Sequence, residues 1–143
     1  MGSASRLLLN ALDFWLGAWT VRDRLTGERA GENVVDRVLD GYAILEHWRS
    51  AGGIDGKSLF FWDRSVETWR QDWVSRGFVN EKSLVDAAPG RARFEGVAHV
   101  DGQTIPDRTT LTALDDGSVA QLIEHSLDSG ASWTPSFAAI YVR

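Results

Sequence analysis

The sequence predicts an all-β protein, a single antiparallel up-and-down barrel of about ten strands preceded by a short N-terminal helix. Three observations support this prediction: turn residues recur along the whole chain, aromatic and β-branched residues crowd between the turns, and the length suits one domain. A chain of 143 residues, 43% of them apolar, can bury a core without a metal or a disulfide. We therefore expect one domain over residues 1–143.

Clusters of turn residues, most of them containing Gly, divide the chain into ten segments. The nine clusters lie at residues 26–27, 40–41, 52–56, 63–68, 76–77, 88–90, 101–102, 115–117 and 128–130. Glycine, and Asp beside it, readily adopts the positive φ angles of tight hairpin turns. A spacing of roughly a dozen residues suits hairpins and leaves no room for the crossover helices of a parallel sheet. An antiparallel meander follows.

Most segments between these turns are typical of strands because aromatic and β-branched residues fill them, as in residues 42–48 and 69–73. Two segments are less clear. Leu7 to Leu16 has the apolar spacing of a short helix before the first strand, whereas Val34 to Leu39 has apolar pairs at i and i+4 that would also fit a helix. We predict a helix for the first segment and a strand for the second.

Ten strands without covering helices would leave two exposed sheet edges, and closing the sheet into a barrel removes both. The interior of such a barrel is wide enough for one small ligand between the inward-facing side chains. A β-sandwich with a filled core and no pocket is the alternative architecture.

The seven tryptophans are far more than a chain of this length usually has, and most lie in or beside predicted strands. Because residues i and i+2 of a strand share a face, Trp69, Gln71 and Trp73 are expected to point inward together. The same alternation places Glu46 on one inward face with Trp48. A buried acid or amide costs several kcal/mol unless it has a partner, so these polar groups indicate an internal network or a polar feature of a ligand. Core filling is the alternative role of the tryptophans.

The residues expected to contact a ligand share the predicted inward faces. They are Glu46, Trp48, Trp62, Gln71, Trp73, Arg108, Gln121 and His125. Arg108 is a natural bidentate partner for Glu46, and a purely structural buried pair is the alternative. The predicted function is binding of a small, mostly apolar molecule. The alternative is a cofactor-free cyclase or isomerase, in which Glu46 or His125 acts as base and Arg108 stabilises developing negative charge; for this purpose strand alternation allows Glu46 to face His125 across the barrel.

Composition excludes several other classes of function. The chain has no cysteine, so disulfides, thiolate metal ligands and a cysteine nucleophile are absent, and its three histidines lack the spacing of zinc ligands. We expect no metal. A net charge of -5, with 15 basic residues scattered among 20 acidic ones, argues against a nucleic-acid partner. The segment Ala51 to Ser58 satisfies a relaxed phosphate-loop pattern but leads into a strand instead of a helix, so nucleotide binding is not expected.

The apolar run Leu7 to Leu9 is too short for a signal peptide or a membrane span. We therefore expect no membrane partner and a cytoplasmic location. A homodimer formed through an exposed aromatic face is a further expectation for partners.

The segment Leu12 to Val21 resembles the start of a large bacterial family of uncharacterised lipocalin-like proteins, whose members open with a D-F-W-x-G-x-W signature. Later parts of the chain are similar to that family's later signatures, in order. These parts are residues 39–48, 56–59, 69–73, Gln121 with Glu124, and 128–133. The resemblance implies a calycin-type barrel and no agreed ligand or activity.

The Gly17-Ala18-Trp19 element also resembles the G-x-W of true lipocalins, in which the indole closes one barrel end against a late arginine. This resemblance implies that role for Arg143. Related barrels that carry haem place a histidine ligand near the chain end, whereas no histidine follows His125 here. We therefore expect no cofactor.

Overall fold

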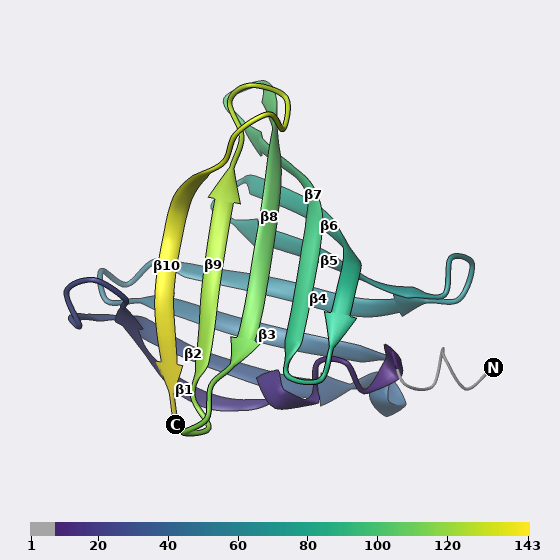
Figure 1. The fold of residues 1–143 in the computed structure, drawn as a ribbon, viewed down its shortest axis with the longest axis vertical. Coiled ribbons are helices and arrows are strands. Elements are labelled where there is room, and N and C mark those ends of the chain that lie inside the picture. Colours follow the sequence, from purple (N-terminus) through teal and green to yellow (C-terminus); the bar gives the residue numbers. More distant parts are fainter. Residues whose placement is uncertain (1–7) are drawn as a thin grey trace.

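The computed structural model describes residues 8–143 and shows ten antiparallel strands closed into one barrel (Figure 1). The strands are β1 (Gly17–Asp23), β2 (Arg29–Val38), β3 (Ala43–Ser50), β4 (Asp55–Asp63), β5 (Thr68–Ser75), β6 (Phe78–Ala88), β7 (Arg91–Val100), β8 (Gln103–Ala113), β9 (Val119–His125) and β10 (Thr134–Val142). Two single-turn 3-10 helices accompany them, η1 (Asp13–Trp15) before β1 and η2 (Leu39–Gly41) after β2. The prediction of an all-β, ten-stranded antiparallel barrel is confirmed.

Each strand pairs with the next one along the chain, and β1 pairs with β10 to close the sheet. The nine predicted turns fall between the ten strands. In the β5–β6 turn Arg76 and Gly77 have φ angles of 48° and 86°, and in the β7–β8 turn Asp101 and Gly102 have 49° and 77°. Two successive positive φ angles are the mark of the tight hairpin turn whose twist matches that of the flanking strands. In Figure 1, β8 to β10 run along the front and β3 to β5 cross behind them at a steep angle.

The segment before β1 is not the continuous helix predicted for Leu7 to Leu16, of which Leu7 lies outside the described residues. Among its described residues Leu8 and Leu9 are helical, a turn follows over 10–12, and in η1 the Trp15 N–H donates to the Leu12 carbonyl at 2.9 Å, the tighter i to i+3 pattern. Leu12 and Trp15 are both fully buried. The apolar spacing therefore reflects a chain that plugs the barrel end, where packing against the strands decides the backbone path.

The predicted strand over Val34 to Leu39 is confirmed as part of β2, which ends at Val38. Asn33 and Val35 face the interior, whereas Val34 is 39% exposed on the outer wall. This alternation is that of a strand with one buried face. In the described part of the chain, no helix has the length and apolar character needed to cross a membrane.

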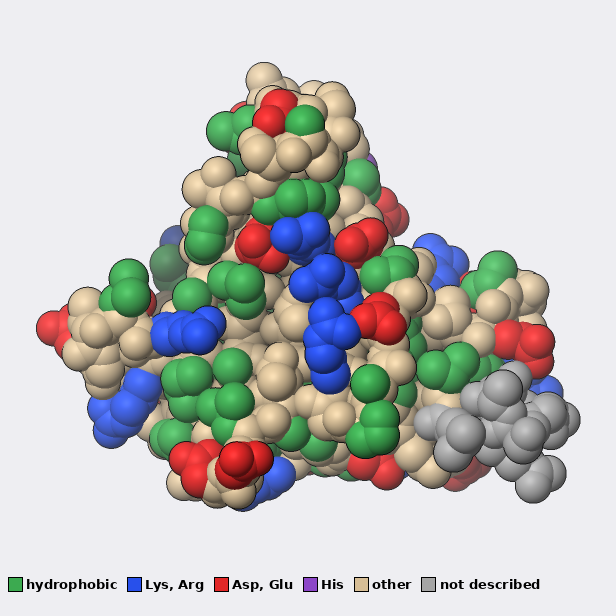
Figure 2. Space-filling view, viewed as in Figure 1, with side chains coloured by type: hydrophobic (Ala, Val, Ile, Leu, Met, Phe, Trp, Pro, Cys, Tyr) green, Lys and Arg blue, Asp and Glu red, His purple; other side chains and the backbone are tan. Residues whose placement is uncertain are grey.

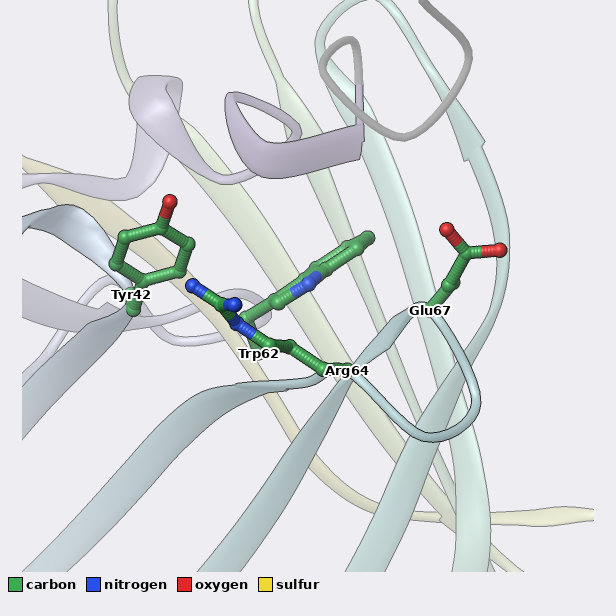
Figure 3. Close-up of a pocket in the computed structure, with 4 residues that line it drawn as sticks. All are labelled: Tyr42, Trp62, Arg64 and Glu67. Carbon is green, nitrogen blue, oxygen red and sulfur yellow. The ribbon is translucent and has the colours of Figure 1, made fainter. Parts of the chain in front are cut away.

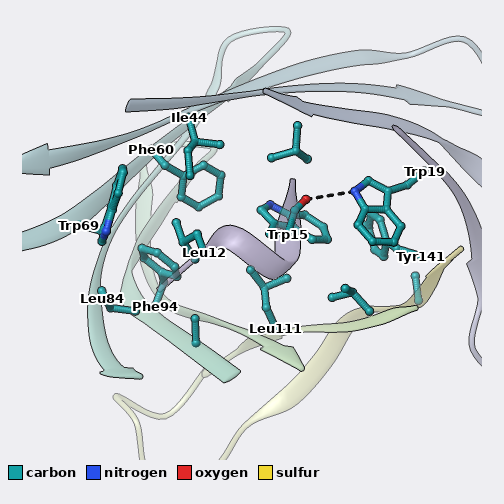
Figure 4. Close-up of a cluster of buried hydrophobic side chains, with 14 of the residues drawn as sticks. Leu12, Trp15, Trp19, Ile44, Phe60, Trp69, Leu84, Phe94, Leu111 and Tyr141 are labelled. Carbon is teal, nitrogen blue, oxygen red and sulfur yellow. Dashed lines mark hydrogen bonds between the residues drawn. The ribbon is translucent and has the colours of Figure 1, made fainter. Parts of the chain in front are cut away.

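One end of the barrel is solid. Leu12 and Trp15, carried by η1 and the turn before it, lie among inward side chains of the surrounding strands (Figure 4). The ring centroids of Trp15 and Tyr141 are 4.8 Å apart with an edge-to-face arrangement, which aromatic pairs favour. The other buried members of this cluster are Trp19, Val21, Val35, Ile44, Phe60, Trp62, Trp69, Leu84, Ala92, Phe94, Leu111, Val119 and Ala139.

The Trp19 indole and the Arg143 guanidinium close this solid end together. Arg143 Cζ lies 4.1 Å from the Trp19 ring centroid, and Arg143 Nη1 donates to the Leu16 carbonyl at 3.1 Å. The Trp19 Nε1–H donates to the Trp15 carbonyl at 3.1 Å. Gly17 has a φ of 137°, and a Cβ there would lie 2.3 Å from Arg143 Nη1, so only glycine leaves room for the arginine. The position that the resemblance implied for Arg143, packed against the Trp19 indole at one barrel end, is confirmed.

Candidate ligand-binding cavity

The half of the barrel away from the plug encloses a cavity of about 320 Å³, within the size range of small-molecule sites. The cavity borders the solid core, because the buried Tyr141 side chain belongs to both. Ser136 in the lining is exposed, and several other lining residues are partly exposed, so the cavity reaches solvent at this end. The lining residues are Glu46, Trp48, Gln71, Trp73, Asn80, Lys82, Thr109, Gln121, Ile123, His125, Ser136, Phe137 and Tyr141.

Aromatic rings frame the outer part of the cavity. Trp48 packs edge to face against Phe137 with ring centroids 5.9 Å apart. Trp73 lies over Gly56, where a Cβ would come within 2.2 Å of the indole, and Trp48 lies over Gly31 in the same way, at 2.7 Å. The two glycines therefore leave the space that the indoles occupy next to the wall.

Glu46 is the one acid among the described residues that line the cavity, and it is only 5% exposed. Asn33 Nδ2 donates to Glu46 Oε2 at 2.9 Å, and the Ser58 hydroxyl is hydrogen-bonded to the same carboxyl group. Ser58 Oγ in turn accepts a hydrogen bond from Gln71 Nε2 at 3.0 Å. Side chains of four neighbouring strands, β2 to β5, thus form one continuous polar chain across the wall.

A second polar cluster lies on the neighbouring wall, where β6 and β8 face each other across β7. Lys82 Nζ lies 2.9 Å from Asp107 Oδ2 and donates to Thr109 Oγ1 at 2.7 Å. Asn80 Nδ2 donates to the same Asp107 oxygen at 2.9 Å. Lys82 and Asp107 are 5% and 0% exposed, so this is a buried ion pair whose partners depend on each other.

Gly96 on β7, the strand between β6 and β8, has no side chain that could come between Lys82 and Asp107. It is the register partner of Lys82 on one side and of Asp107 on the other. A Cβ at this position would lie 1.9 Å from the Glu81 carbonyl oxygen and 2.7 Å from Lys82 Cα. Any side chain here would push the β6 backbone away.

Burial shifts the pKa values of the ionisable groups in the cavity. Desolvation raises the pKa of the Glu46 carboxyl above its ordinary value, against smaller lowering effects of Ser58, Asn33 and the Lys82 charge. Desolvation also lowers the pKa of the Lys82 ammonium, although Asp107 opposes this effect. The pKa of the Tyr141 hydroxyl is raised well above 10.0 by burial and by the Glu46 charge. Tyr141 is therefore neutral, and its oxygen accepts a hydrogen bond from Gln121 Nε2 at 2.6 Å.

Six of the eight predicted ligand contacts lie together in this cavity. They are Glu46, Trp48, Gln71, Trp73, Gln121 and His125. The alternation along β3 and β5 is confirmed, since Glu46 shares its face with Trp48 and Gln71 shares its face with Trp73. Their part in binding a ligand stays a prediction.

The expected pairing of Arg108 with Glu46 is wrong. Asp107 and Thr109 are the inward residues of β8, so Arg108 between them points to the outer wall. There Arg108 Nε donates to Glu124 Oε1 at 2.9 Å, and its guanidinium lies 4.2 Å from the ring centroid of Trp133. Figure 2 shows basic side chains in a column over β7 and β8, flanked by acidic ones. Arg108 therefore cannot stabilise charge inside the barrel.

The expected pairing of Glu46 with His125 is also not formed. His125 does face the interior with Gln121 and Ile123, as alternation predicts. However, its Nε2 lies 3.4 Å from Asp107 Oδ1, on the register partner in β8. His125 is thus associated with the Lys82–Asp107 cluster, on a different wall from Glu46.

Trp62, the remaining predicted contact, lies outside the central cavity. It is 8% exposed, packs against Trp69 with ring centroids 6.2 Å apart, and lines a separate pocket of about 340 Å³ with Tyr42, Arg64 and Glu67 (Figure 3). The Arg64 guanidinium lies 5.4 Å from the Tyr42 ring centroid there. Trp62 follows the inward parity of β4, but it belongs to the plugged half of the barrel.

Sequence reasoning missed Asn33, Lys82, Asp107 and Thr109 as interior polar residues. A signal for three of them exists. Asp107 and Thr109 alternate with Leu111 on one face of β8. Lys82 alternates with Leu84 in the same way along β6. Lysine and aspartate side chains are seldom fully buried. The sequence alone therefore favours an outward position for both Lys82 and Asp107.

The described residues contain no group of three or more His, Cys, Asp or Glu side chains placed to hold a metal ion. The fold and the cavity define the class of protein, a closed ten-stranded antiparallel barrel with an interior pocket at one end, consistent with a lipocalin-like or calycin-like fold. Beyond this class, no protein-family model matches the chain, and no curated protein matches it.

Proposed function

We propose that this protein binds a small, mostly apolar molecule inside the barrel. The observation that carries the proposal is the aromatic-framed cavity of about 320 Å³, with a few polar side chains at its inner wall. Ligand pockets generally combine an apolar lining with a small number of placed polar groups that fix orientation. We further propose that the chain belongs to the lipocalin-like family that its D-F-W-x-G-x-W segment, Asp13 to Trp19, resembles.

A titration of tryptophan fluorescence against a panel of small metabolites tests this proposal. Trp48 and Trp73 line the cavity and report on any molecule that enters it. The proposal expects saturable quenching or a spectral shift with at least one class of apolar compound. Replacing Trp73 by Phe should remove much of that signal, whereas replacing Trp133, on the outer wall, should leave it intact. Signals that stay linear for the entire panel would contradict the proposal.

A second candidate function is cofactor-free acid–base catalysis with Glu46 as the base. The observation in its favour is the burial of this carboxyl group, which raises its pKa toward the neutral range in which general bases work. Lys82 would replace Arg108 as the positive charge near the reacting molecule. Deuterium exchange at acidic C–H positions of bound compounds, followed by NMR in the wild type and in Glu46→Gln, tests this candidate. Equal exchange in both proteins would contradict it.

A further inference from the structure

The wall around Glu46 presents hydrogen-bond acceptors. The Asn33 amide donates to the Glu46 carboxylate, and the Gln71 amide donates to Ser58, whose hydroxyl is hydrogen-bonded to Glu46. Burial raises the pKa of this carboxyl group, whereas these donors favour its charged form, as a cation bound beside it would. The same arrangement leaves Gln71 Oε1 buried with no hydrogen-bond partner among the described residues. A ligand that reaches this wall therefore meets acceptors, and needs donors of its own.

The one lysine among the described residues of the cavity lining, Lys82, already has its own ion-pair and hydrogen-bond partners. Lys82 is ion-paired with Asp107 at 2.9 Å and donates to Thr109 at 2.7 Å. Its effect on Glu46 is that of a nearby charge. With Lys82 and Asp107 balancing each other, Glu46 is the carboxylate of the lining without a matched cation.

Aromatic faces border the acceptors on the side toward solvent. Trp48 follows Glu46 by two residues on the same face of β3, and Trp73 follows Gln71 by two on β5. Phe137 of β10, another lining residue, packs edge to face against Trp48. Rings of tryptophan in particular attract cations to their faces, and they do so more strongly when water is excluded.

We infer that the ligand carries a protonated nitrogen attached to an apolar body, with its N–H groups donating to Glu46 and Gln71 while Trp48 and Trp73 cover it. This inference rests on the proposed function and specifies its ligand class. An ammonium group fits because it supplies both the missing positive charge and several donors. A carboxylate ligand would instead meet the Glu46 charge, and a neutral alcohol would supply only one donor.

Three probes of one shape test the inference at neutral pH. They are 2-phenylethylamine, 2-phenylethanol and phenylacetate, each titrated by tryptophan fluorescence and by NMR chemical shifts. The expected result is that the amine binds about tenfold or more tightly than the alcohol, and that the carboxylate binds least, since a charge-assisted hydrogen bond exceeds a neutral one by this order. In Glu46→Gln the preference for the amine should fall to about one, because the charge is removed while a similar shape is kept.

The matched control is Glu95→Gln on β7, an exposed acid on the outer wall, which should keep the full preference. If Glu46→Gln does not fold, as judged by circular dichroism, Gln71→Met removes the second acceptor and should reduce the preference less strongly. Tighter binding of the alcohol or the carboxylate would overturn the inference and leave the proposed function standing. An amine preference that survives in Glu46→Gln would overturn it as well. Failure of all three probes and of the metabolite panel would overturn both proposals.

Discussion

Lys82 on β6 reaches Asp107 on β8 at 2.9 Å, across a β7 residue that is a glycine. The strand between them would ordinarily interpose a side chain. Gly96 removes it, so the two charges meet inside the barrel instead of each facing a separate neighbour. This relationship links backbone packing to the electrostatics of the cavity, because a change at the glycine acts on both.

Replacing Gly96 by Ala should destabilise the protein by about 1 to 3 kcal/mol, the usual range for overpacking. The added Cβ would meet the Glu81 carbonyl oxygen at 1.9 Å, and backbone cannot yield as a flexible side chain can. Urea unfolding measures the change. Gly52→Ala is the control, since Gly52 lies in the exposed β3–β4 turn with only the Ser50 hydroxyl near its Cβ position, at 3.8 Å. Equal stability of the Gly96→Ala variant and the wild type would contradict the account of this site.

Replacing Asp107 by Leu should cost about 3 to 5 kcal/mol of unfolding free energy, because the Lys82 charge would stay buried without its partner. The double variant Lys82→Met with Asp107→Leu should recover much of that loss, since two apolar residues need no mutual compensation. A double-mutant cycle by urea unfolding measures the coupling. The exposed pair Arg49 and Asp55 serves as comparison and should show a coupling below about 1 kcal/mol. Additive effects at Lys82 and Asp107 would contradict the prediction.

Glu46→Gln should change how stability depends on pH. Burial raises the pKa of the Glu46 carboxyl, so the folded protein holds this proton at pH values where the unfolded chain has lost it. The wild type should therefore lose stability as pH rises from 4.5, the ordinary pKa of a glutamate carboxyl, through the raised pKa, and the variant should lack this decline. Urea unfolding of both proteins across that pH range measures the difference. Parallel pH profiles would show that Glu46 is not the responsible group.

Arg143→Ala should lower stability by about 1 to 2 kcal/mol, because it removes the cation–π contact with Trp19 and the hydrogen bond to Leu16. Thermal unfolding followed by circular dichroism measures this loss. Arg24→Ala changes an exposed arginine in the β1–β2 turn and should have little effect. If the two variants unfold at the same temperature, Arg143 does not close the barrel end.

The sequence predicts the strand order well because each turn is marked locally by turn-forming residues, with glycine in all but the turn at residues 63–68. It also predicts the inward faces of β3 and β5, where tryptophans at alternate positions make the period of two visible. In β8 the alternation of Asp107, Thr109 and Leu111 is a weaker signal, because threonine also occupies the other face at Thr110 and leaves the parity of Arg108 ambiguous. The pairing of Lys82 with Asp107 and the plug around Trp15 depend on contacts between segments far apart in the sequence, which no local pattern encodes.

The central claim is that the barrel interior binds a small molecule. It is tested most directly by filling the cavity with a larger side chain from one strand. Ile123 on β9 lines the cavity, whereas its neighbour Leu122 faces outward. For any compound that binds the wild type in the fluorescence titration, Ile123→Trp should abolish saturable binding and Leu122→Trp should preserve it, with both variants folded by circular dichroism. Unchanged binding in Ile123→Trp would contradict the claim.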